Sequence, residues 1–151
     1  MSVTTDHRAT GHPVHGALLD PEVLPGGEQA RAVRNVPNTL DLFATHFPRF
    51  PILPGVLLVA SAVDVAVLAA PAADHGWRLG EATRVRWRRP VRPGDQVAIL
   101  AELTGRDGDD TLHFKIAATV DGQPVATVRQ LTLVRRLPAP ATVGESPKEQ
   151  R

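Results

Sequence analysis

The stretch from His46 to Ala70, HFPRFPILPGVLLVASAVDVAVLAA, constrains the fold more than any other part of the chain. Three prolines and a glycine follow the histidine closely, at Pro48, Pro51, Pro54 and Gly55. Proline fixes φ, lacks an N–H donor and disfavours helix at the preceding residue, so a helix can begin only at Pro54 or Gly55. Residues 56–70 then carry only two polar side chains, Ser61 and Asp64. The stretch predicts a rigid loop followed by a helix that protein encloses on every side.

Composition limits the class of protein. A chain of 151 residues with 42% hydrophobic content is predicted to be one domain with one core. A net charge of +1 gives no case for general binding to nucleic acid or to a membrane surface. The absence of cysteine excludes a disulfide framework and thiolate chemistry. The sequence shows neither a signal peptide nor a spanning segment, which predicts a cytoplasmic location.

The two ends of the chain differ from its middle. Residues 1–11 are polar and lack periodicity, as does the tail 138–151, and both are predicted to be disordered. A single domain is expected over residues 12–137. At its beginning, Gly16 to Leu24 and Gln29 to Val36 are short apolar runs separated by Pro25-Gly26-Gly27, which predicts strand, turn and strand.

Alternating and turn-forming residues follow the predicted helix. Between residues 78 and 91, one set (Ala82, Arg84, Arg86, Arg88) alternates with another (Thr83, Val85, Trp87, Arg89), and this period of two predicts a long strand. Further strands are predicted at residues 96–104, 111–120 and 124–135, with Asp121-Gly122 as a type I′ hairpin turn. About six antiparallel strands around one long central helix make an α+β fold.

Two motifs then identify a family. The run His46-Phe47-Pro48, Pro51-Ile52, Pro54-Gly55-Val56-Leu57 resembles the HFPxxPIxPGVL signature of the 3-hydroxyacyl-acyl-carrier-protein dehydratases. The segment Arg88-Arg89-Pro90-Val91 followed by Pro93-Gly94-Asp95 is similar to the RRPVxPGD segment of that family. The spacing agrees from about Pro13 to Arg135. The resemblance implies a hotdog fold, in which the sheet wraps around the helix, and dimers with active sites at the interface.

The resemblance also implies roles for individual residues. Dehydration needs a base for the C2 proton, an acid for the C3 hydroxyl and donors for the thioester carbonyl. His46 suits the base because imidazole titrates near neutrality. Gly55 would offer its backbone N–H to the carbonyl, at the positive end of the helix dipole. Substrate would also contact four neighbouring positions, Phe47, Pro54, Val56 and Ala60.

The general acid is the point of departure. Members of the family carry Glu or Asp fourteen residues after the histidine, and that position here is Ala60. Three alternatives remain open. Asp64, one turn further along the helix, could donate the proton, or it could bond Ser61 or an arginine and only fix packing. Asp41 precedes His46 by five residues, and a third source is a carboxylate from the second subunit of a heterodimer.

The arginines and tryptophans of the second half of the chain also carry predictions. The basic run that includes Arg86, Arg88 and Arg89 would either be ordinary solvation of a strand or a docking surface for an acidic acyl carrier protein. Trp77 and Trp87 are expected in the core or in the tunnel wall. No metal-ligand cluster, phosphate loop or nucleophile elbow is recognisable, so no cofactor is expected apart from the phosphopantetheine of the carrier.

Three functions are ranked. The first is removal of water from 3-hydroxyacyl thioesters on an acyl carrier protein in polyketide or fatty acid biosynthesis. The second is a catalytically incomplete hotdog subunit that binds acyl chains or completes the active site of a partner. The third is a hotdog thioesterase or isomerase. The chain is expected to form a homodimer or a heterodimer with another hotdog subunit.

Overall fold

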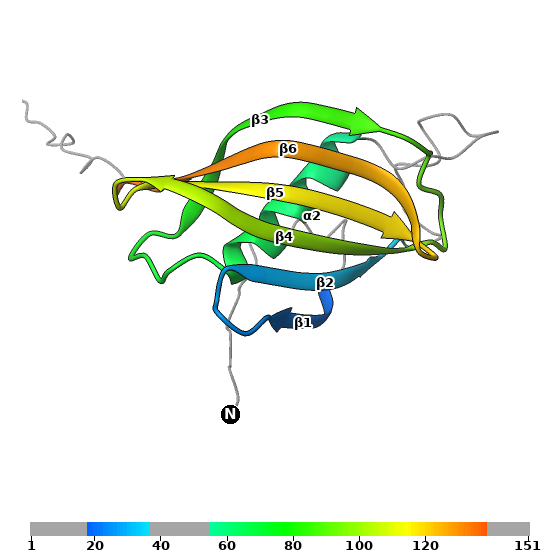
Figure 1. Cartoon of the computed structure of the whole chain (residues 1–151), viewed down its shortest axis with the longest axis horizontal. Helices are drawn as coiled ribbons and strands as arrows, with labels where there is room; N and C mark the ends of the chain where they lie inside the picture. The colour runs from blue at the N-terminus through cyan, green and yellow to red at the C-terminus, as the bar shows by residue number, and fades with distance from the viewer. Residues whose placement is uncertain (1–17, 37–54, 139–151) are drawn as a thin grey trace, which may run out of the picture.

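The computed structural model describes residues 18–36 and 55–138, and these form a curved six-stranded antiparallel sheet with one helix against it (Figure 1). The strands are β1 (Leu18–Val23), β2 (Gln29–Asn35), β3 (Trp77–Trp87), β4 (Gln96–Asp107), β5 (Thr111–Val120) and β6 (Gln123–Arg135), and the helix is α2 (Gly55–Leu68). Their order across the sheet is β1-β2-β4-β5-β6-β3. The predicted α+β hotdog architecture is confirmed.

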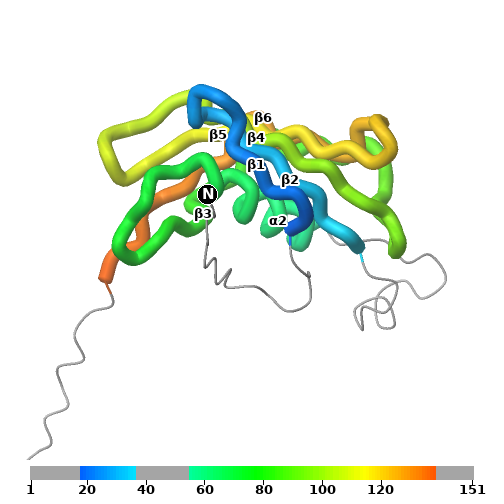
Figure 2. Tube along the Cα trace, turned by 90° about the horizontal axis from the view of Figure 1, so that it is seen from below, coloured from blue at the N-terminus to red at the C-terminus, as the bar shows by residue number. Residues whose placement is uncertain are grey.

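The core lies between α2 and the concave face of the sheet. Figure 2, a view from below, shows α2 against that face of the curved sheet. Alternating side chains of the central strands point toward the helix and are buried, among them Val97, Ile99, Leu112, Phe114 and Ile116. One stripe of the helix packs against these side chains and is buried. It consists of Leu58, Ser61, Ala62, Val65 and Ala66. Burying a large apolar side chain stabilises the fold by about 1.5–3 kcal/mol, so this layer supplies most of the stability.

The helix is not enclosed on every side. Val56 is 73% exposed, and Ala60, Val63 and Val67 on the same stripe of the helix are only half-buried. The prediction of complete enclosure is therefore wrong for the chain alone. The physical reason is geometric: the sheet of one chain curves around one side of α2 and leaves the opposite side uncovered.

Several element boundaries agree with the sequence prediction and two do not. The helix begins at Gly55, β5 covers residues 111–120, and φ values of 52° at Asp121 and 78° at Gly122 confirm the type I′ turn. The last predicted residues of the long strand lie outside β3, which ends at Trp87, because the N–H groups of Arg88 and Arg89 both donate to Val125 O. Strand β4 continues to Asp107, which pairs with Thr111 across the following turn.

The predicted alternation within β3 breaks at Arg84. This residue has φ 55°, and Ala82 and Val85 both pack against the core although three positions separate them. Strand β6 is irregular at the same level. Phe114 and Ile116 of β5 are two residues apart, but their partners in β6, Leu131 and Val128, are three residues apart. Strand β3 pairs with β6 residue by residue through this irregular step. The left-handed conformation of Arg84 therefore turns the side chain of Val85 back toward the core.

Several predictions fall outside the described residues. These concern the leader 1–11, most of the tail, the loop before the helix and the candidate residues Asp41, His46, Phe47 and Pro54. Among the residues that the structure does describe, no helix has the length and apolarity needed to cross a bilayer.

Candidate functional site

Gly55 and Trp87 meet at the N-terminus of α2. Gly55 is the first helical residue, so its N–H and those of the next residues have no acceptor within the helix. A Cβ atom added at Gly55 would lie 2.6 Å from Cζ2 and 3.0 Å from Cη2 of the Trp87 indole. Trp87 is the last residue of β3 and remains 49% exposed. Only glycine allows the indole to lie this close to the end of the helix.

An apolar pocket lies next to this contact. Trp87 and three helix residues, Leu58, Val59 and Ala62, line one part of it, and the sheet supplies Ile99, Ile116, Ala118 and Val128. The free space in the pocket is about 10 Å³, far below the roughly 300–1,000 Å³ of a complete ligand site. The described residues of one chain thus form an apolar recess beside the N-terminus of the helix. The arrangement suits a carbonyl at the helix end with an apolar chain beyond it.

Asp64 is paired with an arginine of the sheet. Nη2 of Arg34 donates to Oδ2 of Asp64 at 2.6 Å, which joins β2 to the helix. The Arg34 side chain is 6% exposed and that of Asp64 is 35% exposed. The hydroxyl of Ser61 is buried and has no hydrogen-bond partner among the described residues, so Asp64 bonds the arginine and not this serine. Asp64 here accepts a charge-assisted hydrogen bond, which is the role of an ionised carboxylate.

The sequence analysis missed Arg34, although the sequence contains a signal for it. In β2 the buried residues alternate as Ala30, Ala32 and Arg34, which places an arginine at a position where the pattern directs side chains into the core. A charge at such a position needs a partner of opposite sign. The nearby helix carries Asp64, and the ion pair between Arg34 and Asp64 compensates the two charges.

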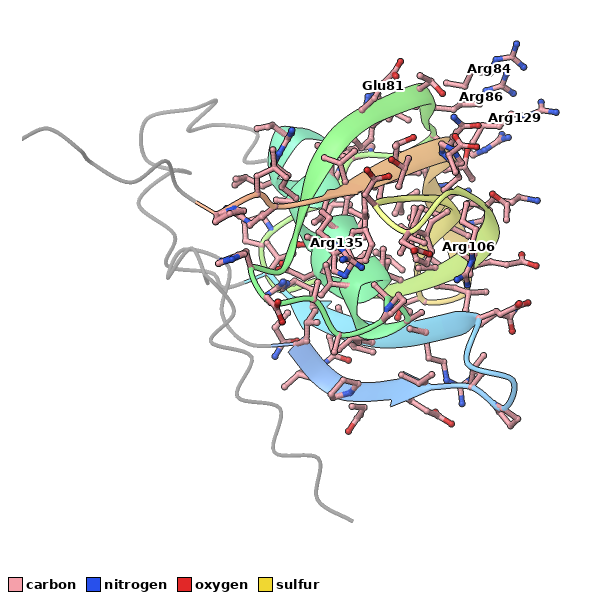
Figure 3. The ribbon with its side chains drawn as sticks, turned by 90° about the vertical axis from the view of Figure 1, so that its left-hand side faces the viewer. Glu81, Arg84, Arg86, Arg106, Arg129 and Arg135 are labelled. Atoms are coloured by element: carbon pink, nitrogen blue, oxygen red, sulfur yellow. The ribbon has the colours of Figure 1, made fainter. Side chains whose placement is uncertain are left out.

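The remaining predicted residues are spread around the helix end and the β3 edge. Ala60 is half-buried on α2, one turn before Asp64, and Val56 is exposed. Arg86 points away from the helix, as Figure 3 shows, while Arg88 and Arg89 are exposed just after β3. The structure therefore brings Gly55 and Trp87 together at the start of the helix, whereas Ala60 lies further along it on the half-buried stripe. The catalytic role of His46 and the substrate contacts of Phe47 and Pro54 stay predictions, because these residues lie outside the described ranges.

Comparison with known proteins identifies the family. A family model described as ApeI-like, ApeI dehydratase, matches residues 23–129. A 3-hydroxyacyl-[acyl-carrier-protein] dehydratase FabZ from Granulibacter bethesdensis is 35% identical over 126 residues, which cover 80% of this chain and 73% of the relative. A FabZ from Albidiferax ferrireducens is 33% identical over 118 residues, covering 74% of this chain and 78% of that relative.

A solved structure agrees with this assignment. It is described as the dehydratase heterocomplex ApeI:P from Xenorhabdus doucetiae, and it matches with a TM-score of 0.61 and 26% identity over 79% of this chain and 97% of that chain. A protein described as a hypothetical thioesterase with coenzyme A from Streptococcus pneumoniae matches with a TM-score of 0.66 over 87% of this chain and 96% of that chain, but at 12% identity this likeness concerns the fold alone. The chain belongs to the ApeI-like family of hotdog dehydratases.

Proposed function

We propose that this protein removes water from 3-hydroxyacyl thioesters carried by an acyl carrier protein, in polyketide or fatty acid biosynthesis. The observation that carries the proposal is the end of α2, where Gly55 begins the helix beside an apolar recess in a chain of a dehydratase family. The dehydratase relatives of this chain, named for 3-hydroxyacyl carrier substrates, support the same substrate class.

In the proposed reaction, a C2–H bond and the C3–O bond break and a double bond forms between C2 and C3. The imidazole of His46 takes the C2 proton, and the C3 hydroxyl leaves as water with a proton from a general acid. The N–H of Gly55 donates to the thioester oxygen as negative charge develops on it. The phosphopantetheine of the carrier protein holds the substrate, and no other cofactor is expected.

The source of the acid is the second part of the proposal. The ion pair of Asp64 with Arg34 supports the packing role for Asp64, because it joins the helix to an almost fully buried arginine of β2. Ala60 cannot donate a proton. It lies on the half-exposed stripe of α2, where a second chain would bring its own side chains. We therefore favour an acid supplied by a second hotdog subunit over Asp64 and Asp41.

A second candidate function follows from the same observations. If the acid belongs to the other chain, the reciprocal site that contains Ala60 is inactive, and this protein serves partly as a structural subunit. The similarity to a dehydratase heterocomplex supports a hotdog partner of this kind. No observation favours the thioesterase or isomerase alternative. The cytoplasmic location stays a prediction.

The test measures dehydration of a 3-hydroxyacyl carrier protein by mass spectrometry. The chain is assayed alone and after co-purification with a dehydratase-like chain that has Glu or Asp at the position matching Ala60. We expect activity mainly in the complex, and we expect His46→Ala in this chain to abolish it. Complex activity that is unaffected by His46→Ala would overturn the assignment of the base.

A further inference from the structure

Trp87 differs from every other residue that lines the apolar recess. Its side chain is half-exposed, whereas the other lining residues are buried, apart from the half-buried Val59. Strand β3, which ends at Trp87, is an edge of the sheet (Figure 1), while the other strands that line the recess are interior ones. The indole is therefore the part of the wall that lies between the recess and the solvent.

Small residues surround the indole. Trp87 pairs with Ala126 of β6, and Ala126 pairs with Ala118 of β5, so two alanines lie at the level of the indole on the same face of the sheet. From the helix, Ala62 faces the same recess. Small side chains beside a large one leave room that the large one fills. Only about 10 Å³ in the recess remain free, so the indole fills the space that these alanines leave.

The indole also adjoins the proposed position of the thioester. Its ring edge lies against Gly55, where an added Cβ atom would be 2.6 Å from Cζ2 of Trp87. Gly55 is the first residue of α2, so the N–H group proposed to hold the thioester oxygen lies next to the ring. An acyl chain that runs from this carbonyl toward the recess meets the indole first.

The two tryptophans of the chain are held in different ways. Nε1 of Trp77 donates to Pro71 O at 2.8 Å, and this side chain is 7% exposed. Among the described residues, no hydrogen bond holds the indole of Trp87, which stays in place by packing alone. Substitution of Trp87 therefore leaves no buried polar group without its partner, and its main effect is to empty space beside the recess.

We infer that Trp87 limits the length of the acyl chain that the site accepts, so that this protein acts on short 3-hydroxyacyl groups. The inference rests on the proposed function and narrows the substrate class of the same site. With the ring in place, the interior behind it is close-packed and has no room for further methylene groups. Without the ring, the surrounding alanines would line an apolar cavity, and such cavities stay free of water and take up apolar ligands.

The first measurement is the binding of saturated acyl pantetheine thioesters, which have no hydroxyl to lose, so that binding is read separately from dehydration. Butanoyl and octanoyl pantetheine are titrated into the wild type and into Trp87→Ala, in the same assembly for both proteins. We expect the wild type to bind the two thioesters with affinities that agree within about threefold. Trp87→Ala should bind the octanoyl thioester about tenfold or more tightly than the butanoyl one, because each newly buried CH2 group strengthens binding by about fourfold.

Two further variants complete the experiment. Trp87→Phe keeps a smaller aromatic ring, so its preference should lie between those of the wild type and Trp87→Ala, and it serves if Trp87→Ala does not fold. The matched control is Trp77→Phe, which alters the indole outside the recess and should bind both thioesters like the wild type. In the catalytically active preparation, the ratio of kcat/KM for 3-hydroxyoctanoyl over 3-hydroxybutanoyl pantetheine should follow the same order.

Two results would overturn the inference: a wild type that already prefers the octanoyl thioester by about tenfold, or a folded Trp87→Ala or Trp87→Phe protein with the wild-type preference. An equal change of preference in Trp77→Phe would do the same. Binding of neither thioester by the wild type would overturn both the inference and the proposed function. The expected preferences without any dehydration of 3-hydroxyacyl substrates would support the inference and contradict only the proposed reaction.

Discussion

At the scale of single residues, two contacts determine what each half of α2 can do. Near its start, Gly55 lets the Trp87 indole approach the helix end. Near its middle, Asp64 binds Arg34 and fixes the helix against β2. The first contact shapes one wall of the apolar recess, and the second ties up Asp64, the carboxylate of the helix, in an ion pair. Both can be tested by small substitutions.

We expect Asp64→Asn to lower the free energy of unfolding by about 2 kcal/mol, because it removes the carboxylate that a buried guanidinium contacts. Urea denaturation measures this. The control is Glu22→Gln, which breaks the exposed pair between Arg31 and Glu22 and should cost less than about 0.5 kcal/mol. Dehydration by the subunit complex should survive Asp64→Asn. A loss of about a hundredfold or more in rate, with the protein folded, would instead identify Asp64 as the acid.

We expect Gly55→Ala to push the indole of Trp87 out of its place, because the new methyl group would lie 2.6 Å from the ring. In a Trp77→Phe background, Trp87 is the only indole, and its fluorescence should shift to longer wavelength as the ring becomes more exposed. Val56→Ala, one residue along the helix and on its exposed side, should leave the spectrum unchanged. An unaltered spectrum in Gly55→Ala would show that the ring does not depend on this contact.

At the scale of elements, β3 combines regular and irregular parts. Its register with β6 is continuous from Ala82 to Trp87, yet Arg84 adopts a left-handed conformation within it. This irregularity sets the directions of the two residues that follow: Val85 points inward and Arg86 outward.

We expect Arg84→Gly to stabilise the protein by about 1 kcal/mol, because glycine adopts a positive φ without strain and the repulsion with Arg129, which lies opposite it in β6, disappears. Thermal and urea unfolding measure the effect. The matched variant Arg86→Gly, at a regular position of the same strand, should destabilise by about 0.5–1 kcal/mol. Equal destabilisation by both changes would contradict the account of a strained Arg84.

Strand β3 also shows which features of the fold the sequence alone can predict. Periodicity and turn residues predict the elements well, because the helix start at Gly55 and the Asp121-Gly122 turn depend on local backbone chemistry. The break in alternation at Arg84 was not predictable, because it matches an irregular step in β6, a strand that lies far along the chain. Similarly, the proline-rich motif predicts the start of the helix at Gly55. The pairing of Asp64 with Arg34 depends on the packing of β2 against the helix, which the sequence alone does not show.

At the scale of the whole molecule, the described residues of one chain form only part of the site that we propose. Its sheet covers one side of α2, and the stripe that contains Ala60 stays half-exposed. The recess beside Gly55 is smaller than a full acyl site. Both features are expected under our proposal that a second chain completes the site, and a similar solved structure is described as a dehydratase heterocomplex.

The most direct measurement of this account is the dehydration rate of the isolated chain after Ala60→Glu, with Ala60→Gln as the control of similar size. Because Glu would supply a proton donor at the position where the sequence resemblance places the acid, we predict that Ala60→Glu raises the rate by about 10²–10⁴. We also predict that Ala60→Gln does not raise it and that adding His46→Ala removes the gain. A folded Ala60→Glu protein with no gain, or a gain that persists without His46, would contradict the central claim that this chain provides the base and lacks the acid.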